Sequence, residues 1–505
     1  MLLRVSNPFP SIAKVAQWAY DAVKGSLKRP SPTGVNRSGD ADLLPAQRAQ
    51  MVSAGRDIHQ NFALVGWAVR KHLDYVSTFT FQGKLENAEH NARVEAFVKK
   101  WSAKENFDVA QRHDLRRFIR LAEQRRLLDG DVFIAKLDGE KRIKGKVQAL
   151  EGDRIRSRYG EHGGLATPAG QTPPEVIQGV EIDEWGAATS YHVWRRRRGG
   201  TGFEFEKPMK AKWVFHHFYI DRFDQTRGVS PFAPVYNTLT DLYKGFDYAL
   251  AKMKLSQLLG FIVTRTSAEE LGEHEEIPTI DPATGQRKIK YKVKLGDDPI
   301  KMELDPGEDV KIVESAQPSR EFQSFSQTLI ALVLKALDIP YSFYAENFSN
   351  YSGSRQALLQ YEQSADNRRA ENRDLLNDLT LWRLKMAIED SDPDLAGITL
   401  DELRWEWVAS ALPWIDPVKE VTANIAAVAN GFDSTPGVCK AQGRDAFEIA
   451  KEQADYEKKI GDYRESIGLP RVPASNAVSY AQLAALSMAP DPAPSQEGAK
   501  HATAA

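Results

Sequence analysis

Two long amphipathic segments, separated by a short acidic one, constrain the fold of this chain more than any other feature. The first runs from about Phe232 to Leu259 and the second from about Arg320 to Leu337. Apolar residues recur every three or four positions in the first segment, at Val235, Leu239, Leu242, Phe246, Leu250 and Met253. In a helix this spacing produces one continuous apolar stripe. The sequence therefore predicts a pair of long helices that pack against neighbouring helices.

The second segment repeats the pattern, and the stretch between the two differs from both in charge. The second helix is expected to carry its stripe at Phe322, Phe325, Leu329, Leu332 and Ala336. Between Thr264 and Ser315 the chain has thirteen acidic and eight basic residues. The turn residues Asp281–Gly285, followed by an alternating run at Arg287–Lys294, are typical of a β-hairpin. A small acidic β insertion is thus expected at residues 262–316.

The part before the first long helix divides into an arm, a set of helices and a set of strands. Residues 1–44 begin with an amphipathic stretch and continue into a Pro-, Gly- and Ser-rich linker. Helical periodicity marks Pro45–His72, Leu85–Trp101 and Arg112–Leu128. β-Branched and aromatic runs then predict a mainly antiparallel sheet. Its strands are Asp131–Leu137, Lys146–Glu151, Val176–Ile182, Ser190–Arg195 and Trp213–Phe218.

Helices are also expected after the second amphipathic segment. Tyr341–Ser354 reads as an aromatic, Asn- and Ser-rich loop, and a very polar helix starts near Ser354 and extends toward Glu389. A helix that is polar all round needs another surface, a channel or a neighbouring subunit to stabilise it. Further helices are predicted at Val418–Ala429 and Arg444–Ile467, before a Pro-rich tail at residues 489–505.

Composition narrows the classes of function. The formal net charge of the 505-residue chain is −2, so it lacks the basic excess of proteins that grip nucleic acid tightly. Cys439 is the single cysteine, which excludes an internal disulfide and disfavours cysteine-based zinc sites. The sequence has no apolar run of about 18 residues, so no membrane partner is expected.

Motifs for catalysis are weak. The sequence contains neither a phosphate-binding loop of the G-x-x-x-x-G-K-S/T type nor a G-x-S-x-G elbow. The best metal-like cluster is His216 and His217 with Asp221 and Asp224. Adjacent histidines on a strand point to opposite faces and do not easily share one ion. We therefore expect no catalytic residue, no cofactor and no metal. A metal-dependent DNA-processing enzyme using His216, His217 and Asp221 remains the alternative.

Three tryptophans gather within ten residues, at Trp405, Trp407 and Trp414. Residues 404–409 alternate in polarity as on a strand, so the rings have two interpretations. They can seat the strand and the following turn against the core of the chain. Alternatively they anchor a subunit interface, where aromatic side chains are enriched.

Several stretches, taken in order, resemble the lambda-type family of tailed-bacteriophage portal proteins, the head–tail connectors. They span about residues 45–470, and their order and spacing are more specific than any one of them. They are Leu128-Asp-Gly-Asp-Val-Phe133, Gly152-Asp-Arg-Ile155, Gln225-Thr-Arg-Gly-Val-Ser-Pro-Phe-Ala-Pro234, Asn350-Tyr-Ser-Gly-Ser-Arg-Gln-Ala-Leu-Leu359 and Pro413-Trp-Ile-Asp-Pro-Val-Lys-Glu420.

The resemblance implies an α+β ring subunit with a helical stem, a mixed α/β wing, a small β-containing clip and a helical C-terminal crown. An N-terminal arm and linker (1–44) would precede the wing (45–231). Two stem helices (232–261 and 317–340) would flank the clip (262–316). A tunnel loop (341–354), a long helix returning to the wing (355–430), the crown (431–488) and a disordered tail (489–505) would follow. Channel-facing residues are expected at Asn347, Asn350, Tyr351 and Arg355.

The same resemblance implies partners and a place of action. Such a subunit would form a homododecamer at one capsid vertex, assembled in the cytoplasm of the bacterial host. It would meet the terminase large subunit, the major capsid or scaffolding protein, head–tail adaptor proteins and double-stranded DNA passing through the channel. The near-neutral charge and the acidic insertion predict that this DNA is held weakly. Another capsid-associated adaptor is the remaining alternative to a portal.

Overall fold

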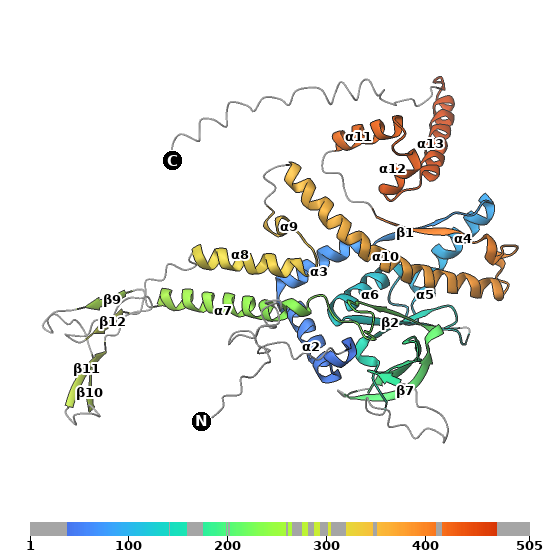
Figure 1. Cartoon of the computed structure of the whole chain (residues 1–505). Helices are drawn as coiled ribbons and strands as arrows, with labels where there is room; N and C mark the ends of the chain where they lie inside the picture. Colours follow the sequence, from blue (N-terminus) through green and yellow to red (C-terminus); the bar gives the residue numbers. More distant parts are fainter. Residues whose placement is uncertain are drawn as a thin grey trace, which may run out of the picture.

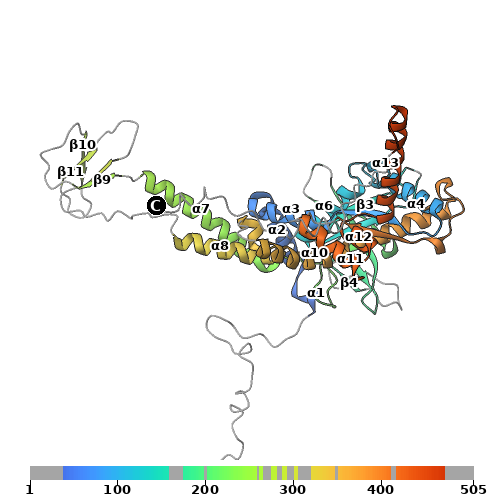
Figure 2. The ribbon, with the colours of Figure 1, turned by 90° about the horizontal axis from the view of Figure 1, so that it is seen from above.

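The computed structural model describes residues 38–140, 142–158, 175–197, 199, 202–258, 261–264, 275–280, 287–292, 301–304, 320–346, 351–410 and 417–471. These residues form a broad body of helices and sheets. Two helices, α7 (Tyr236–Leu258) and α8 (Arg320–Lys335), pack on each other and extend from the body side by side (Figures 1 and 2). The mixture of helices and sheets agrees with the predicted α+β class at this coarse level.

The first helical region of the body contains two helices where the sequence predicts one. The short helix α1 (Gly39–Asp42) is followed by α2 (Pro45–Asn61) and α3 (Ala63–Val76). Phe62, between α2 and α3, has an extended backbone with φ −112° and ψ 108°. Because an extended residue cannot continue the helical hydrogen-bond ladder, the helix breaks there. The ring of Phe62 instead packs against Tyr243 of α7, with 5.4 Å between ring centroids.

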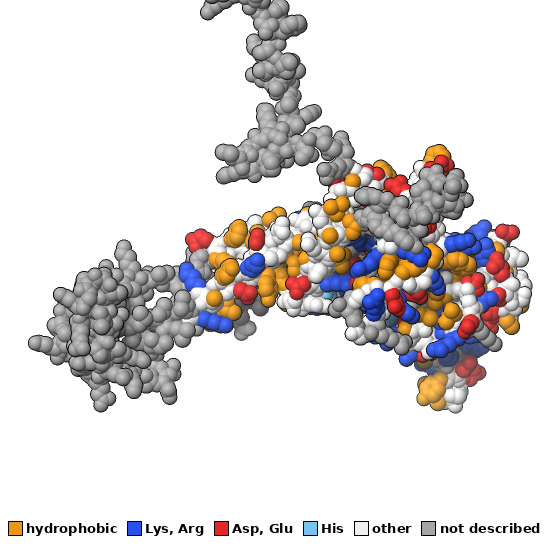
Figure 3. Space-filling model, turned by 90° about the horizontal axis from the view of Figure 1, so that it is seen from below, with side chains coloured by type: hydrophobic (Ala, Val, Ile, Leu, Met, Phe, Trp, Pro, Cys, Tyr) orange, Lys and Arg blue, Asp and Glu red, His pale blue; other side chains and the backbone are white. Residues whose placement is uncertain are grey.

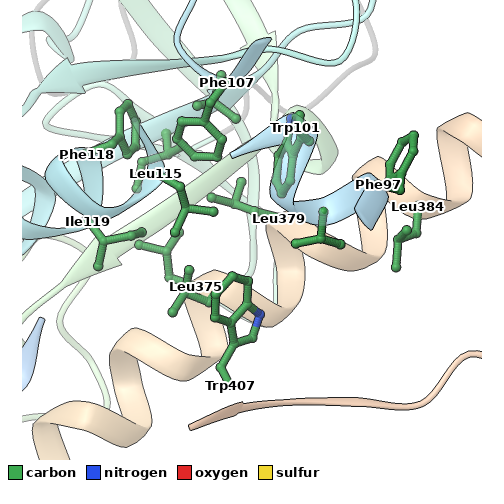
Figure 4. Packing of buried hydrophobic residues seen from close by; sticks show 14 of the residues in the cluster. Phe97, Trp101, Phe107, Leu115, Phe118, Ile119, Leu375, Leu379, Leu384 and Trp407 are labelled. Atoms are coloured by element: carbon green, nitrogen blue, oxygen red, sulfur yellow. The ribbon is translucent and has the colours of Figure 1, made fainter. Parts of the chain in front are cut away.

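The larger apolar core of the body lies between α4 (Ala88–Trp101), α6 (Leu115–Asp129) and α10 (Tyr351–Glu389) (Figure 4). The Asn87 and Asp114 side chains cap the first turns of α4 and α6, which fixes where both helices begin. Phe107, in the short helix α5 (Lys104–Phe107), lies between Trp101 and Phe118, at ring-centroid distances of 4.9 and 5.1 Å.

One antiparallel sheet packs on this core, a second sheet packs on the other face of the first through a third apolar core, and a further strand pair lies apart from both. The first sheet has the order β3–β2–β8, from β2 (Asp131–Lys136), β3 (Val147–Glu151) and β8 (Val214–Phe218). The second has the order β4–β5–β6–β7, from β4 (Glu175–Ile177), β5 (Val180–Ile182), β6 (Ala188–Arg196) and β7 (Phe203–Lys210). β1 (Phe79–Gly83) pairs with β13 (Trp405–Ala409).

The prediction of a single strand over Val176–Ile182 was wrong. Gln178 and Gly179 have φ of 46° and 88°, in the left-handed region, so the chain turns there and β4 pairs with β5. Gly is the residue that adopts this conformation without strain, and it supplies the second position of the two-residue turn. The predicted single sheet is divided into two, and the strands β1 and β7 were not predicted.

The paired helices pack into a second apolar core, formed with α2, α3 and α10. On α7 the predicted stripe is divided: Leu239 and Leu242 are buried, whereas Phe246 and Leu250 are exposed by 37% and 49%. On α8 the predicted face was partly wrong, since Phe325 and Leu332 are exposed by 60% and 53%. The buried residues of α8 are Ser326, Ile330, Val333 and Leu334. α8 is therefore apolar on two sides, only one of which is covered.

The described residues between α7 and α8 form four short strands. β10 (Glu275–Ile280) and β11 (Arg287–Lys292) pair antiparallel, with Ile280 opposite Arg287, which confirms the predicted hairpin. β9 (Phe261–Thr264) and β12 (Lys301–Leu304) pair in parallel. The turn Asp281–Gly285 lies outside the described residues.

The predicted loop Tyr341–Ser354 begins as a helix and ends inside another. Tyr341–Ala345 form α9, in which Tyr341 and Phe343 pack against the second core, and α10 already begins at Tyr351. One side of the polar middle of α10 packs against other parts of the same chain. Ala365, Arg368, Arg369 and Asn372 are buried there. The sequence left open whether another surface, a channel or a neighbouring subunit explains the polarity of this helix. A surface within the chain is sufficient.

Three helices close the described chain: α11 (Pro417–Ala429), α12 (Thr435–Ala441) and α13 (Ala446–Ser466). Ser434 caps α12, and Asp445 caps α13. Lys84–Asp445 (2.8 Å) and Lys440–Glu406 (2.6 Å) ion pairs connect these helices to the body. In the part of the chain that the structure describes, no helix combines the length and the apolar character that crossing a membrane requires.

Candidate assembly surfaces and their buried scaffold

A buried carboxylate, Asp131 at the start of β2, lies at the centre of the body. It accepts hydrogen bonds from Arg48 Nη2 of α2 and from Arg227 Nε, both at 2.7 Å. Burial alone would raise the pKa of Asp131, but the two guanidinium groups outweigh it and hold that pKa well below its usual range. Burial, together with the nearby Arg227, lowers the pKa of Arg48 to about 10. Asp131 is thus ionised and paired at neutral pH.

Arg227 connects this carboxylate to two further segments through three carbonyl groups. Its guanidinium donates to the carbonyl oxygens of Gly152 (2.8 Å), Gln178 (2.6 Å) and Ile155 (3.1 Å). The backbone segments beside Arg227 approach so closely that glycine is required, because a Cβ on Gly228 would overlap the carbonyl oxygen of Gly130. We call Asp131, Arg48 and Arg227 the arginine hub. Three stretches that carry the family resemblance, Leu128–Phe133, Gly152–Ile155 and Gln225–Pro234, meet at this hub.

A second buried network joins α6, β8 and α10. Glu123 accepts from Arg126 Nε at 2.8 Å and lies 3.2 Å from His217 Nε2. His217 also lies 3.0 Å from Asn372 Oδ1, and Asn372 donates to the carbonyl oxygen of Val76 at 3.1 Å. Burial would raise the pKa of Glu123, but Arg126 and His217 hold it well below its usual range. These contacts provide hydrogen-bond partners for both amide atoms of Asn372, a polar side chain that α10 buries.

The histidine pair does not form a shared metal site. His217 faces Glu123 and Asn372, whereas His216 points to the other face of β8, between the rings of Phe133 and Phe218 at 4.1 Å each. Burial lowers the pKa of His216 to about 4, so its ring is neutral at pH 7. Asp221 is exposed. Among the described residues, no three or more His, Cys, Asp or Glu side chains are grouped so as to hold a metal.

Two of the four residues predicted to face a channel lie within the described chain. Asn347 and Asn350 fall outside it, and Tyr351 is the first residue of α10. Arg355 forms an ion pair with Glu420 of α11 at 2.8 Å. This pair joins the fourth and fifth stretches of the resemblance, which are about 60 residues apart in the sequence. A role of these residues in a channel stays a prediction.

The tryptophan cluster divides between the core and the surface. Trp407 on β13 is buried against Phe81 (5.2 Å between centroids), and its Nε1 donates to Thr380 Oγ1 at 3.2 Å. Trp405 is half-buried and donates to Asn377 Oδ1 at 3.1 Å, and Trp414 lies outside the described residues. Trp407 thus seats its strand against the core, the first of the two interpretations. An interface role for Trp405 and Trp414 stays a prediction.

Exposed apolar side chains gather on the paired helices. Phe325 and Leu332 on α8 are one heptad apart and therefore lie on the same face. On α7, Tyr243, Tyr248 and Leu250 are exposed by 42%, 72% and 49%. Figure 3 shows hydrophobic side chains spread along these helices. Exposed apolar patches of this kind mark surfaces that associate with another protein. We call these residues of α7 and α8 the stem surface.

The last helix is similarly uncovered. On α13 and just beyond it, Tyr456, Tyr463 and Ile467 are exposed by 60%, 64% and 53%, and Gly461 is the one buried residue among those the structure describes in this helix. Tyr456 and Tyr463 are seven positions apart and lie on one face. A 21-residue helix with so little tertiary contact is marginal on its own in water. Both the stem surface and α13 therefore have the character of assembly surfaces.

A comparison with known protein families decides where this chain belongs. Residues 31–369 match the lambda family of phage portal proteins, which is well over half of the 505 residues. The chain belongs to the lambda family of phage portal proteins. The match includes the arginine hub, both helices of the stem surface and the predicted channel residues.

One relative of this portal chain is itself named as a portal protein. It is 23% identical over 476 residues to a protein named "Probable portal protein" of Halomonas phage phiHAP-1, covering 87% of this chain and 85% of that protein. Among solved structures, a chain of the neck of a native GTA particle, computed with C12 symmetry, has a TM-score of 0.44, 12% identity and coverage of 80% and 94%. A chain of the virion of a native gene transfer agent has a TM-score of 0.43, 12% identity and coverage of 82% and 96%.

The arginine hub was not among the site residues predicted from the sequence. Its three main residues lie 83 and 96 positions apart, and no local spacing links them. One signal was available: Arg227 and Asp131 each stand beside glycines in stretches otherwise recognised only by resemblance. The structure shows why these glycines are needed, since Gly130 and Gly228 lie in close backbone contact beside the two charged residues.

Proposed function

We propose that this portal chain forms a ring of twelve identical subunits at one capsid vertex, through which the genome is packaged and ejected. The observation that carries the proposal is the stem surface of α7 and α8, which stays exposed in one chain although α8 is apolar on two sides. A closed ring gives each subunit two neighbours. Such a ring would cover the free side of each helix pair with the adjacent subunit.

The parts of the ring are proposed from the resemblance to portal proteins. Residues 45–231 would form the wing, 232–261 and 317–340 the stem, and 262–316 the clip. The tunnel loop would occupy residues 341–354, followed by the return to the wing (355–430) and the crown (431–488). An N-terminal arm (1–44) and a C-terminal tail (489–505) would complete the subunit. The family membership and the exposed helices support this division.

Four residues are proposed to lie near the channel: Asn347, Asn350, Tyr351 and Arg355. Amide and hydroxyl groups can contact phosphates without the counterion release that makes basic patches bind DNA tightly. The charge of the clip segment, with thirteen acidic and eight basic residues, fits a passage that repels the DNA backbone. Double-stranded DNA would therefore slide through with weak contacts.

Partners of the ring are proposed from the membership of the portal family. Portals serve as channels between a capsid and a tail, so the ring would meet the terminase large subunit during packaging and head–tail adaptor proteins afterwards. The wing would contact the major capsid or scaffolding protein. Assembly would take place in the cytoplasm of the bacterial host, and the product is part of the virion. No cofactor or metal is proposed, and the chain is proposed to be structural and without catalysis.

The test is the assembly state of variants on the free side of α8. The double variant Phe325→Asp and Leu332→Asp places two charges on the stem surface, where burial against a neighbour would be strongly unfavourable. We expect the wild-type chain to form rings of about twelve subunits by native mass spectrometry and negative-stain microscopy, and the double variant to remain monomeric with unchanged circular dichroism.

The matched control is Ser324→Asp, an exposed position on the same helix that is about 100° from Phe325 and outside the apolar pair. It should assemble like the wild type. Rings that form equally well from the double variant would show that the stem surface is not a subunit interface. A wild-type chain that remains monomeric at high concentration would count against the ring itself.

A further inference from the structure

A groove of about 660 Å³ opens on the wing, away from the stem surface and from α13. One wall is the sheet edge formed by β4, β5 and β6, where Ile177, Val180, Ile182 and Tyr191 line it. The opposite wall is formed by His216 and Phe218 of β8 and by the segment after it. The floor is therefore largely apolar, and the volume suits several side chains of a peptide segment rather than one water cluster.

Two aromatic side chains stand at this groove almost without contacts. Trp185, in the turn between β5 and β6, is exposed by 85%, and Phe223 is fully exposed. Both are among the residues that line the groove. Large aromatic side chains left in water next to an apolar hollow indicate a surface that another segment covers.

The charged side chains that line the groove are acidic. Asp40, Glu175 and Asp224 line it, and no lysine or arginine is among the described residues that do so. Arg222, which lies nearby, approaches Asp224 at 3.3 Å and Asp42 at 2.9 Å and offsets part of this charge. The groove therefore favours an occupant that is apolar on one side and carries basic residues.

The sequence of this chain contains a segment of that chemistry next to the groove. Ser38 is the first residue that the structure describes, and it is one of the residues that line the groove. The 37 residues before it contain six basic residues and one acidic residue, Asp21. Phe9, Ile12, Val15 and Trp18 recur at intervals of three within the first 25. The twelve residues 26–37 can span at most about 40 Å when extended, enough to reach the groove.

We propose that residues 1–25 of this chain dock in the groove between β4–β5–β6 and β8, with apolar side chains against Trp185 and Phe223 and basic ones against Glu175, Asp40 and Asp224. The groove is then the place where the N-terminal arm is held against the wing. This inference does not depend on the ring, because the groove and the segment both belong to one polypeptide. The arm can come from the same subunit or from a second copy, and the experiment separates the two.

The test uses the full-length chain with the photoreactive residue p-benzoylphenylalanine in place of Trp185. Illumination followed by peptide mass spectrometry should show crosslinks from position 185 to residues 1–25. The matched control carries the same photoreactive residue at Phe432, which is exposed by 87% and lies after α11. We expect at least a tenfold lower yield of crosslinks to residues 1–25 from the control.

Mixing isotopically labelled and unlabelled chains identifies the source of the arm. Crosslinks within one isotope class assign it to the same subunit, and mixed crosslinks assign it to a second copy; both support the proposal. Crosslinks from position 185 only to other segments, such as residues 472–505, or none above the control, would overturn it.

A second measurement covers the case in which the photoreactive residue disturbs the site. Hydrogen exchange of residues 1–25 should become at least tenfold faster in the Trp185→Ala and Phe223→Ala double variant and in Glu175→Lys, with unchanged exchange in β6 and β8. Because all three positions are at the surface, the fold should persist. Equal exchange of residues 1–25 in the wild type and both variants would also contradict docking. Ring assembly is measured separately on the same samples. A chain that does not form rings is therefore distinguished from a chain in which residues 1–25 do not dock in the groove.

Discussion

The guanidinium group of Arg227 is the point at which several distant segments of this portal chain are joined. One side chain contacts Asp131 and three carbonyl oxygens, and Asp131 in turn holds Arg48 of α2. A buried ion pair of this kind contributes little compared with an apolar replacement of the whole group, but the loss of one partner is costly. The remaining charge is then buried without compensation.

We expect Arg227→Met to lower the free energy of unfolding by about 3–5 kcal/mol, because it leaves Asp131 with one guanidinium partner and orphans three carbonyl groups. Urea unfolding followed by circular dichroism measures the change. Arg195→Met is the control, since its ion pair with Glu204 is exposed to solvent and its loss should change the free energy of unfolding little. Equal effects of the two substitutions would mean that the hub is not a structural centre.

Buried histidines give the body a predictable dependence on pH. Burial lowers the pKa of His72 to about 3 and that of His216 to about 4, and it also lowers the pKa of His217. Below pH 6.5 the unfolded chain takes up protons that the folded chain refuses. The stability is therefore complete above pH 6.5 and is lost as the pH falls toward the folded values. Asp131 and Glu123, with lowered pKa values, add losses only near pH 4 and below.

The expected slope is about 1.4 kcal/mol per pH unit for each of His72 and His216 between pH 6 and 5. Urea midpoints at pH 7.5, 6.5 and 5.5 should show little change over the first step and a marked fall over the second. His217→Gln, which keeps a hydrogen-bonding side chain but does not titrate, should make the fall smaller. A midpoint that stays constant from pH 7.5 to 5.5 would refute the assignment.

At the scale of elements, the sequence predicted what depends on local pattern and missed what depends on distant contacts. The long helices, the hairpin at β10–β11 and the strands β2, β3, β6 and β8 carry periods of 3.6 or 2 in their own residues. The break at Phe62 was missed because its cause is the packing of the ring on α7, nearly 180 residues away. The covered face of α8 was misjudged because apolar residues occupy two sides, and only the fold decides which is covered first.

The candidate site divides in the same way. The resemblance picked out Gln225–Pro234 and Gly152–Ile155, but their shared role appears only when Arg227 is placed against Asp131. Trp407 had two interpretations from the sequence, and the packing against Phe81 favours the core. Arg355 was expected near a channel, and its partner Glu420 could not be anticipated because no spacing rule links residues 65 positions apart.

The exposure of α13 predicts fast amide exchange in this helix. Because its side chains are exposed almost throughout, its amides should exchange with solvent at least tenfold faster in the monomer than those of α10 at Asn372–Thr380, where Leu375, Leu376 and Leu379 anchor the helix in the core. Hydrogen exchange with mass spectrometry compares the two helices in one sample, so α10 is the internal control. If α13 is an assembly surface, its protection should rise in the assembled particle. Equal protection of α13 before and after assembly would exclude it from the subunit contacts.

At the scale of the whole molecule, charge is the property that bears on transport. A channel must admit a polyanion without trapping it, and every phosphate that is neutralised by a basic side chain adds about 0.9 to the slope of log affinity against log salt. The chain has 67 basic and 69 acidic residues, and the excess of acid is concentrated in the segment between α7 and α8. Its overall field should therefore neither attract duplex DNA strongly nor hold it.

The assembled protein should bind a labelled DNA duplex at 0.15 M salt no more tightly than ordinary non-specific binding, about 10⁻⁴ to 10⁻⁶ M, with a salt slope below about three. Fluorescence anisotropy between 0.05 and 0.2 M salt measures both quantities. Replacing Glu273, Glu275 and Glu276 with lysine should tighten binding and steepen the slope if DNA passes the segment between α7 and α8. The same three-charge reversal at Glu105, Asp138 and Glu140, exposed positions on the body, should have less effect, because DNA within a channel would not reach them. Tight, steeply salt-dependent binding by the wild type would contradict a sliding passage, because a channel that neutralises many phosphates holds the genome that it has to release.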